Sequence, residues 1–423
     1  MRAMATLALA LRSIWNRRTT ALLTIAAIAV SVALLLGVQK MRTAAKDSFA
    51  NTVSGVDLIV GARSGPLNLL LYSVFRVGDA TANVSWETYQ MIARHRDVAW
   101  TIPISLGDSH RGFRVLGTTG DYFRHYHYAG ERELAFATGR PFTDLYDAVL
   151  GAEVARQLGY KVGDPIVVAH GLGAVSFAKH EDKPFTVVGI LAPTGTPVDR
   201  TVHVSLEAIT AIHIDWQSGM QAMPGQRVSA DEARSADLTP DSITAFMVGM
   251  QSKALTFTMQ RAINDYRKEP LLAIIPGVAL SQLWELVGVA DRALMVIAAF
   301  VVLAGLLGML TAILTSLNER RREMAILRSV GARARHVFTL LVAEAGLLAS
   351  TGVALGVGLA YGLMAAAKPL LADRYGIFVQ ITGLSRYDLA ILGSIIAAAL
   401  LMGLLPAWRA YRNTLSDGLT IRV

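Results

Sequence analysis

Four long stretches without a charged residue constrain the fold of this chain more than any other feature. They contain 21, 26, 23 and 20 residues and cover positions 19–39, 293–318, 345–367 and 389–408. A helix rises about 1.5 Å per residue and the hydrocarbon core of a bilayer is about 30 Å thick, so about 20 apolar residues cross it. The sequence therefore predicts four membrane-spanning helices. The first stretch is longer than the apolar region of a signal peptide, and no clean A-x-A site follows it, which favours an uncleaved span.

Composition agrees with a membrane protein and excludes several other classes. The chain is 53% hydrophobic and only 17% charged, whereas soluble domains are about a quarter charged. Cysteine is absent, which excludes disulfides, thiolate nucleophiles and cysteine-ligated metals. The net charge of +8 is compatible with nucleic-acid binding. No basic patch is interleaved with aromatic residues, however, so we expect no nucleic-acid partner.

The distribution of basic residues predicts the orientation of the spans. Residues 1–18 carry four arginines and no acid, and residues 318–336 carry six arginines against two glutamates. The tail at 409–423 carries three arginines against one aspartate, while residues 368–388 are nearly balanced. Because basic residues accumulate on the cytoplasmic side, both termini and the 318–336 loop are expected in the cytoplasm. Residues 40–290 then form one large domain on the other side of the membrane.

The predicted fold is a membrane protein of four transmembrane α-helices, with a large mixed α/β extracytoplasmic domain inserted between helix 1 and helix 2. In order, the predicted parts are an amphipathic cytoplasmic helix at 1–18, the first span at 19–39, the external domain at 40–290, the second span at 291–317, a cytoplasmic loop at 318–336, the third span at 337–367, a short external loop at 368–388, the fourth span at 389–408 and a cytoplasmic tail at 409–423. Within the external domain, we expect residues 40–118 and 240–290 nearest the membrane and residues 120–235 farther away.

The external domain alternates between strand-like and helix-like stretches. Segments rich in β-branched residues predict strands at 56–60, 114–116, 165–168, 185–190 and 201–204. Serine or glycine before an apolar-periodic stretch predicts helices at 85–94, 151–158 and 205–212. Residues 219–240 are polar and broken by glycine and proline, which predicts a flexible loop. Residues 264–270, followed by 282–294, are expected to form a helix that leads into the second span.

An apolar patch at residues 67–74 has two interpretations. It could lie on the outer leaflet or line an entry for a lipid-like substrate, or it could be an ordinary segment of the domain core. Small residues in the third span, Gly352, Gly356, Gly358 and Gly362, predict close helix packing, either within this chain or across a dimer.

The arginine-rich loop NERRREMAILRSVGARAR, residues 318–335, also carries an apolar stripe. Glu323, then Ile326 or Leu327, and then Val330 are spaced three or four apart, which places them on one face of a short helix that Gly331 would end. Such a helix can seat in a groove of a soluble partner while its arginines pair with acidic groups at the rim. The alternative is a loop whose charge only fixes topology, but this leaves the apolar stripe unexplained.

Several stretches carry a resemblance to a known family. The loop ERRREMAILRSVGA is the most specific, and AVLGAEVARQLGYKVGDPIVV, FTVVGILAPTGTPVDRTVHVSLEAI and LLPAWRAYRNTLSDGL add to it. Together with the order of the parts, they resemble the MacB-type, FtsX-like permeases of ABC transporters over nearly the whole chain. In that family the loop couples the membrane subunit to the ATPase. The resemblance assigns this role to Glu319, Arg320, Glu323, Met324, Leu327, Arg328, Gly331 and Ala332.

Glu344 follows this loop, near the cytoplasmic end of the third span, where an unpaired carboxylate is costly. It is expected either to support the loop through a hydrogen bond or to belong to a conduction path.

The resemblance implies a separate ATPase subunit that carries ATP and Mg²⁺. The chain has no G-x-x-x-x-G-K-[ST] phosphate loop, so we expect it to be neither an enzyme nor the holder of a cofactor. The other expected partners are a second copy or a homologous permease, the lipid bilayer, and a periplasmic adaptor, lipoprotein or hydrolase. The expected function is extrusion or extraction of a lipid-like, peptide or other hydrophobic substrate by mechanotransmission. The alternatives are an FtsX-like regulator of a periplasmic partner, such as a cell-wall hydrolase, and a metal- or haem-handling permease.

Histidines of the external domain are the remaining candidates for chemistry. His125 and His127 are two residues apart, so on a strand they would share a face and could meet one Zn²⁺. His170 and His180 flank a glycine-rich segment. Because no third ligand is evident, the sequence predicts no metal site, with His125 and His127 as the candidates if one exists.

Overall fold

The computed structural model describes residues 15, 17–50, 52–171, 180–216, 228–319, 326, 329, 332–375 and 381–412. The chain divides into two units. The helical unit consists of residues 1–43, 288–369 and 379–423, and the α/β unit consists of residues 44–287 and 370–378. The amphipathic helix expected at 1–18 and the tail beyond residue 412 lie almost wholly outside the described residues.

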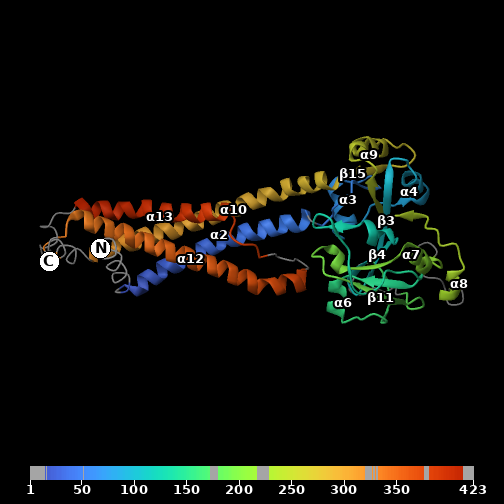
Figure 1. Cartoon of the computed structure of the whole chain (residues 1–423), viewed down its shortest axis with the longest axis horizontal. Helices are drawn as coiled ribbons and strands as arrows, with labels where there is room; N and C mark the ends of the chain where they lie inside the picture. Colours follow the sequence, from blue (N-terminus) through green and yellow to red (C-terminus); the bar gives the residue numbers. More distant parts are fainter. Residues whose placement is uncertain are drawn as a thin grey trace. The chain divides into compact units, whose positions relative to one another are not determined.

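The helical unit is built on four long helices (Figure 1). They are α2 (Arg18–Ala50), α10 (Pro276–Glu319), α12 (Ala334–Tyr375) and α13 (Arg386–Arg412). Each contains a segment long and apolar enough to cross a membrane: Arg18–Thr43, Arg292–Leu317, Ala334–Leu370 and Arg386–Arg412. The predicted arrangement of one span, a large insertion and three further spans is confirmed.

Close approach of α2 and α12 depends on two glycines. A Cβ added at Gly352 would lie 2.8 Å from the Cβ of Ile28, and one added at Gly356 would lie 2.7 Å from the backbone oxygen of Ala29. Small residues at these positions let the two backbones approach, which is how membrane helices gain packing energy without a hydrophobic driving force. A Cβ added at Gly358 would meet no described atom within 4 Å, so among the described residues only part of the predicted glycine stripe packs closely.

The α/β unit contains an 11-stranded mixed sheet. Nine strands follow the order β15-β1-β14-β3-β4-β12-β8-β11-β7, while β10 pairs with β3 and β9 pairs with β11. The strands are β1 (Leu58–Ala62), β3 (Val98–His110), β4 (Phe113–Thr118), β7 (Phe136–Gly139), β8 (Asp147–Leu150), β9 (Pro165–Ile166), β10 (Ala169–His170), β11 (Phe185–Leu191), β12 (Thr201–Ser205), β14 (Ala245–Met250) and β15 (Leu271–Ile274). Two small pairs stand apart, β2 (Val84–Ser85) with β13 (Ser242–Ile243), and β5 (His127–Tyr128) with β6 (Arg132–Glu133).

Strand β3 joins the two halves of this sheet. Its first part pairs with β14 and its second part pairs with β4, with a register shift between Leu106 and Ser109. A bulge of this kind bends a strand and re-aims its side chains. Beyond it, three consecutive residues, Asp108, Ser109 and His110, are buried. In a regular strand, neighbouring side chains point to opposite faces. The irregularity therefore brings the Asp108 carboxylate into the interior.

Short helices cover the sheet, and several were predicted. They are α3 (Pro66–Ser73), α4 (Trp86–Ala93), α5 (Asp121–His125), α6 (Ala152–Leu158), α7 (Leu206–His213), α8 (Ala230–Arg234) and α9 (Thr256–Asn264). The expected caps are present, since Ser85 accepts a hydrogen bond from the Thr88 amide and Ser205 accepts one from the Ala208 amide. These bonds satisfy amides that have no partner inside the first turn of each helix.

Of the two interpretations of the apolar patch at 67–74, the structure agrees with a segment of the domain core. The patch lies mostly on α3, and its Leu69 and Leu70 are buried. Two other expectations about the external domain are wrong. Part of the loop expected at 219–240 is the helix α8, which a capping box of Ser229 and Glu232 begins. The helix expected at 264–270 is interrupted, because strand β15 lies between α9 and α10.

Candidate functional site

The predicted coupling loop lies largely outside the described residues. This applies to Arg320, Glu323, Met324, Leu327, Arg328 and Gly331. Of the others, Glu319 is the last residue of α10 and Ala332 lies two residues before α12 begins. Ile326, a member of the apolar stripe, is described and is 53% exposed. An exposed isoleucine agrees with an apolar docking surface, and the coupling role of the loop stays a prediction.

Glu344 lies in the interior of the helical unit. It is on α12, 6% exposed, beside the core residues Leu341 and Ala345. A carboxylate at this place requires polar partners, because hydrocarbon offers none. Support of the loop and participation in a conduction path both stay predictions for this residue.

A buried ion pair inside the helical unit was not predicted. The Lys40 ammonium of α2 lies 2.8 Å from an Asp388 carboxylate oxygen on α13, and the two side chains are 9% and 2% exposed. Lys40 also donates to the Gly383 carbonyl at 2.8 Å, and Asp388 accepts from the Ser385 amide at 2.8 Å. The pair lies where the first predicted span ends and the fourth begins, so it joins two helices at one end of the unit.

A cluster of three histidines and one aspartate occupies the α/β unit. Asp108 comes from β3 and is 3% exposed, His170 comes from β10, and His213 is the last residue of α7. The carboxylate oxygen Oδ1 of Asp108 lies 3.2 Å from Nδ1 of His170 and 3.5 Å from Nε2 of His213. These two ring nitrogens are 3.3 Å apart. Three potential ligand atoms therefore form a nearly equilateral triangle.

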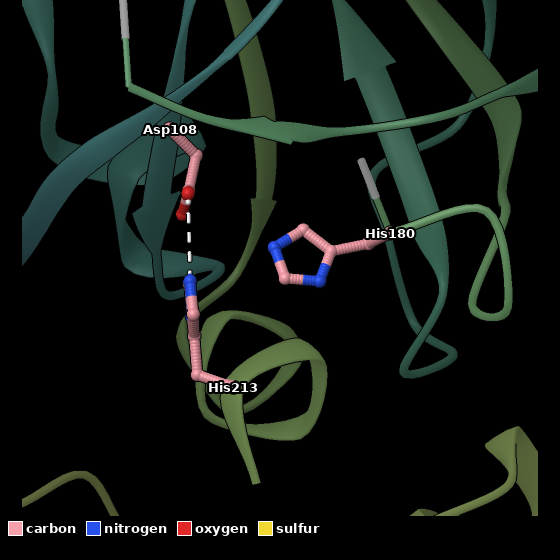
Figure 2. A group of neighbouring side chains, drawn as sticks. All are labelled: Asp108, His180 and His213. Atoms are coloured by element: carbon pink, nitrogen blue, oxygen red, sulfur yellow. Dashed lines mark ion pairs between the residues drawn. The ribbon is translucent and has the colours of Figure 1, made fainter. Parts of the chain in front are cut away.

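His180 completes this cluster from another segment of the chain. Its imidazole points toward the Asp108–His213 pair (Figure 2). One ligand atom each from Asp108, His180 and His213 lies within 4.8 Å of the others. His180 is 1% exposed, and its Nε2 has no hydrogen-bond partner among the described residues. The Trp216 ring packs 5.1–5.7 Å from the rings of His170, His180 and His213. The cluster is buried at Asp108 and His180, whereas the His170 side chain is 50% exposed.

The protonation states follow from burial and pairing. Burial favours the neutral form of Asp108, but hydrogen bonds to His170 and His213 outweigh it and hold the pKa of the carboxyl at about 2. Burial lowers the pKa of His213, and the hydrogen bond and charge of Asp108 raise it above its usual value. Burial lowers the pKa of His180 to about 4. At neutral pH the cluster therefore contains an anionic carboxylate and, at His180, a neutral imidazole with a free lone pair.

The predicted histidine pair does not form a metal site in this arrangement. His125 is the last residue of helix α5 and stacks on Trp100 with ring centroids 5.0 Å apart, whereas His127 lies on strand β5. The premise that both side chains share one strand face is wrong. The group of metal-type ligands that the described residues bring together does not include either of them.

The cluster could not be found from sequence spacing. The only signal was the placement of His170 and His180 on both sides of one segment. Asp108 is 62 residues before His170, and only the pairing of β10 with β3 brings them together. His213 is 43 residues after His170 and arrives through the end of α7.

The architecture defines a class of membrane protein: a permease-type unit of four apolar helices that carries a large α/β domain between its first and second helix. Residues 21–266 match the family model described as the MacB-like periplasmic core domain, and residues 295–415 match that of the FtsX-like permease C-terminal region. Since the first match alone covers more than half of the chain, the chain belongs to the MacB-type, FtsX-like family of ABC transporter permeases.

Two relatives show how the chain relates to longer proteins. It is 24% identical over 241 residues to the macrolide export ATP-binding/permease protein MacB of Azoarcus sp. (strain BH72), covering 54% of this chain and 32% of that protein. It is 25% identical over 265 residues to the pyoverdine export ATP-binding/permease protein PvdT of Pseudomonas syringae pv. tomato (strain ATCC BAA-871 / DC3000), covering 62% and 37%. The chain thus spans about a third of the length of these relatives.

Two solved structures are similar to part of the chain. The periplasmic region of MacB from Actinobacillus actinomycetemcomitans matches with a TM-score of 0.34 and 10% identity, covering 55% of this chain and 94% of that one. The extracellular domain of the transporter YknZ from Gram-positive bacteria matches with a TM-score of 0.30 and 13% identity, covering 52% and 98%.

Proposed function

We propose that this chain is the permease subunit of an ABC transporter of the bacterial inner membrane, and that a separate subunit carries the ATPase with its ATP and Mg²⁺. Both termini and the 318–336 loop lie in the cytoplasm, and residues 40–290 lie in the periplasm. The charge distribution along the chain supports this orientation. The relatives that the chain resembles are named ATP-binding/permease proteins, which supports an ATPase that works with this permease.

The observation that carries the proposal is the connection between long helices and adjacent strands. Helix α10 has 44 residues and begins two residues after β15, while α2 ends eight residues before β1. At about 1.5 Å per residue, α10 is about 66 Å long, more than twice the thickness of a bilayer core. Strands β1 and β15 pair with each other. Relative motion of α2 and α10 therefore acts directly on two hydrogen-bonded strands.

This connectivity fits mechanotransmission. ATP binding draws the ATPase subunits together, the coupling loop follows them, and α10, which ends at the start of that loop, moves with it. The α/β unit changes its position or shape in response, and a lipid-like, peptide or other hydrophobic substrate is extruded or extracted. A regulator of a periplasmic partner, or a metal or haem permease, would share the ATPase-docking step and differ in what the α/β unit acts on.

The test is retention of the ATPase by a variant of the coupling loop. The chain is purified from native membranes with an affinity tag, and co-purifying proteins that contain a phosphate-loop motif are quantified by mass spectrometry. Replacing Glu323 by Lys and Leu327 by Asp reverses one charge and places a carboxylate in the apolar stripe. We expect this variant to lose the ATPase by on the order of tenfold or more, because burying an unpaired charge in an interface costs several kcal/mol.

The matched control carries the same two kinds of change on the external domain, Glu131→Lys and Val162→Asp, where both residues are exposed. This control should retain the ATPase as the unmodified chain does. Equal recovery of the ATPase with the loop variant would contradict the coupling role of the loop. Absence of any ATPase from the unmodified chain would contradict the proposed function as a whole.

A further inference from the structure

We propose that Asp108, His170, His180 and His213 form a binding site for a divalent transition metal ion of the Zn²⁺ class in the α/β unit. The inference rests on the geometry of these residues and is independent of the proposed ATPase coupling. The family resemblance does not imply this site, and His125 and His127 are not part of it.

The first argument is the size of the ligand triangle. A tetrahedral zinc ion with ligands at about 2.0–2.1 Å holds neighbouring ligand atoms about 3.3–3.4 Å apart. The three distances among Asp108 Oδ1, His170 Nδ1 and His213 Nε2 are 3.2, 3.3 and 3.5 Å. These atoms therefore have the spacing of one face of a zinc coordination tetrahedron, on side chains that arrive from three different elements.

The second argument is the proton on His213. Its Nδ1 lies 2.8 Å from the Ile209 carbonyl oxygen, which only accepts hydrogen bonds, so Nδ1 carries a hydrogen. Nε2 faces both a carboxylate oxygen and a second ring nitrogen. In the protonated ring it donates to Asp108, and in the neutral ring it is a lone pair that a metal ion can take in place of the proton. Three electron-rich atoms this close repel one another unless a proton or a cation lies among them. A hydrogen bond from Nδ1 to a backbone carbonyl is also how proteins orient a metal-binding histidine.

The third argument is the unsatisfied nitrogen of His180. A buried ring nitrogen without a partner is costly, and such groups are rare in folded proteins. His180 Nε2 has no hydrogen-bond partner among the described residues, and its ring is directed at the Asp108–His213 pair (Figure 2). One ligand atom each from His180, Asp108 and His213 lies within 4.8 Å of the others, so a shift of at most about 1.5 Å brings His180 to the 3.3–3.4 Å spacing of neighbouring zinc ligands.

The donor set selects the kind of ion. Three imidazoles and one carboxylate suit zinc and the neighbouring divalent ions cobalt, nickel and copper. Calcium and magnesium prefer six or more oxygen ligands, and the site offers one carboxylate. Beside the site, the buried Lys183 ammonium pairs with two carboxylates, Asp182 at 2.9 Å and Asp215 at 3.4 Å, which leaves this group one negative charge in excess. A bound ion would tie β3, β10 and α7 together through side chains distant in sequence.

The experiment measures metal binding by the full-length chain in detergent, purified with an affinity tag that contains no histidine. The chain is loaded with Zn²⁺, dialysed against chelator-free buffer, and analysed for metal content. We expect one tightly held zinc ion per chain. Loading with Co²⁺ instead should give the intense visible absorption of a tetrahedral cobalt site, which requires no variant.

Two variants locate the ion. His180→Gln and His213→Gln should each weaken zinc binding by more than the roughly 10–100-fold that loss of an outer-shell partner costs. The matched control, His125→Gln together with His127→Gln, removes two external histidines and should bind zinc as the unmodified chain does. Circular dichroism and gel filtration confirm that each variant is folded. Zinc that dialyses away from the unmodified chain, an octahedral cobalt spectrum, or loss of zinc only in the His125/His127 control would each overturn the proposal.

Discussion

At the scale of single residues, the glycines of α12 show how backbone contact distinguishes positions that look alike in sequence. Four glycines were expected to allow close packing, and the structure divides them. A Cβ added at Gly352 or Gly356 would collide with α2, whereas one added at Gly358 or Gly362 would meet no described atom within 4 Å. The first two are therefore fixed by contacts inside the chain. The other two leave a surface on which a second permease copy could pack, as the predicted dimer requires.

Gly356→Leu should destabilise the helical unit. An added Cβ lies 2.7 Å from the Ala29 backbone oxygen, and a backbone atom cannot move aside as a flexible side chain does. Overpacking of this kind costs about 1–3 kcal/mol. We expect a thermal unfolding midpoint several degrees lower for the detergent-purified chain. Gly358→Leu is the matched control on the same helix and should not lower the midpoint, because an added Cβ there meets no described atom within 4 Å and leucine has the higher helix propensity. An equal loss for both variants would contradict the packing account.

At the scale of elements, the ion pair between Lys40 and Asp388 holds α2 to α13. In the sequence, Asp388 is only one charge of the nearly balanced segment at 368–388, because nothing in local spacing indicates a partner 348 positions away. Buried ion pairs contribute little net stability when compared with apolar residues of the same size, but removing one partner leaves an uncompensated charge. The consequence is a coupling between two helices that a double-mutant cycle can measure.

Lys40→Met should destabilise the helical unit by about 3–5 kcal/mol, since it leaves the Asp388 carboxylate buried without its ammonium partner. The double variant Lys40→Met with Asp388→Asn should be less destabilised than the sum of the two single changes. Thermal unfolding of the four proteins in detergent gives the cycle. Lys253→Met, at an exposed lysine of the α/β unit, is the control. Additive effects within error would mean that the two side chains do not interact in the folded protein.

The elements that the sequence predicted are those with a strong local signal. The four spans follow from long uncharged stretches, and α4 and α7 follow from a serine cap before an apolar-periodic segment. Strand β14 was not predicted, because all six residues of AFMVGM are buried and a continuous apolar run has no period to distinguish strand from helix. The bulge of β3 and the histidine cluster depend on pairing between distant strands, which no local pattern contains.

At the scale of the whole molecule, two helices connect a membrane unit to a sheet domain through adjacent strands. Helices α2 and α10 continue without interruption across the division between the two units. Continuous helices transmit displacement because each residue is held by hydrogen bonds along the axis. The other end of α10 leads into the 318–336 loop, so the chain offers one unbroken element from the predicted docking surface to the sheet. The central claim is that an ATPase sits at that docking surface.

Site-specific cross-linking tests this claim most directly, because the chain contains no cysteine and any introduced thiol is its only one. Cysteine is placed at Ala332, in the coupling loop, or at Ser235, an exposed residue of the α/β unit. Native membranes are treated with a short thiol-reactive cross-linker and adducts are identified by mass spectrometry. We predict that Ala332→Cys forms an adduct with a phosphate-loop ATPase and that Ser235→Cys does not. Failure of Ala332→Cys to form an ATPase adduct, or an equal yield from Ser235→Cys, would contradict the account.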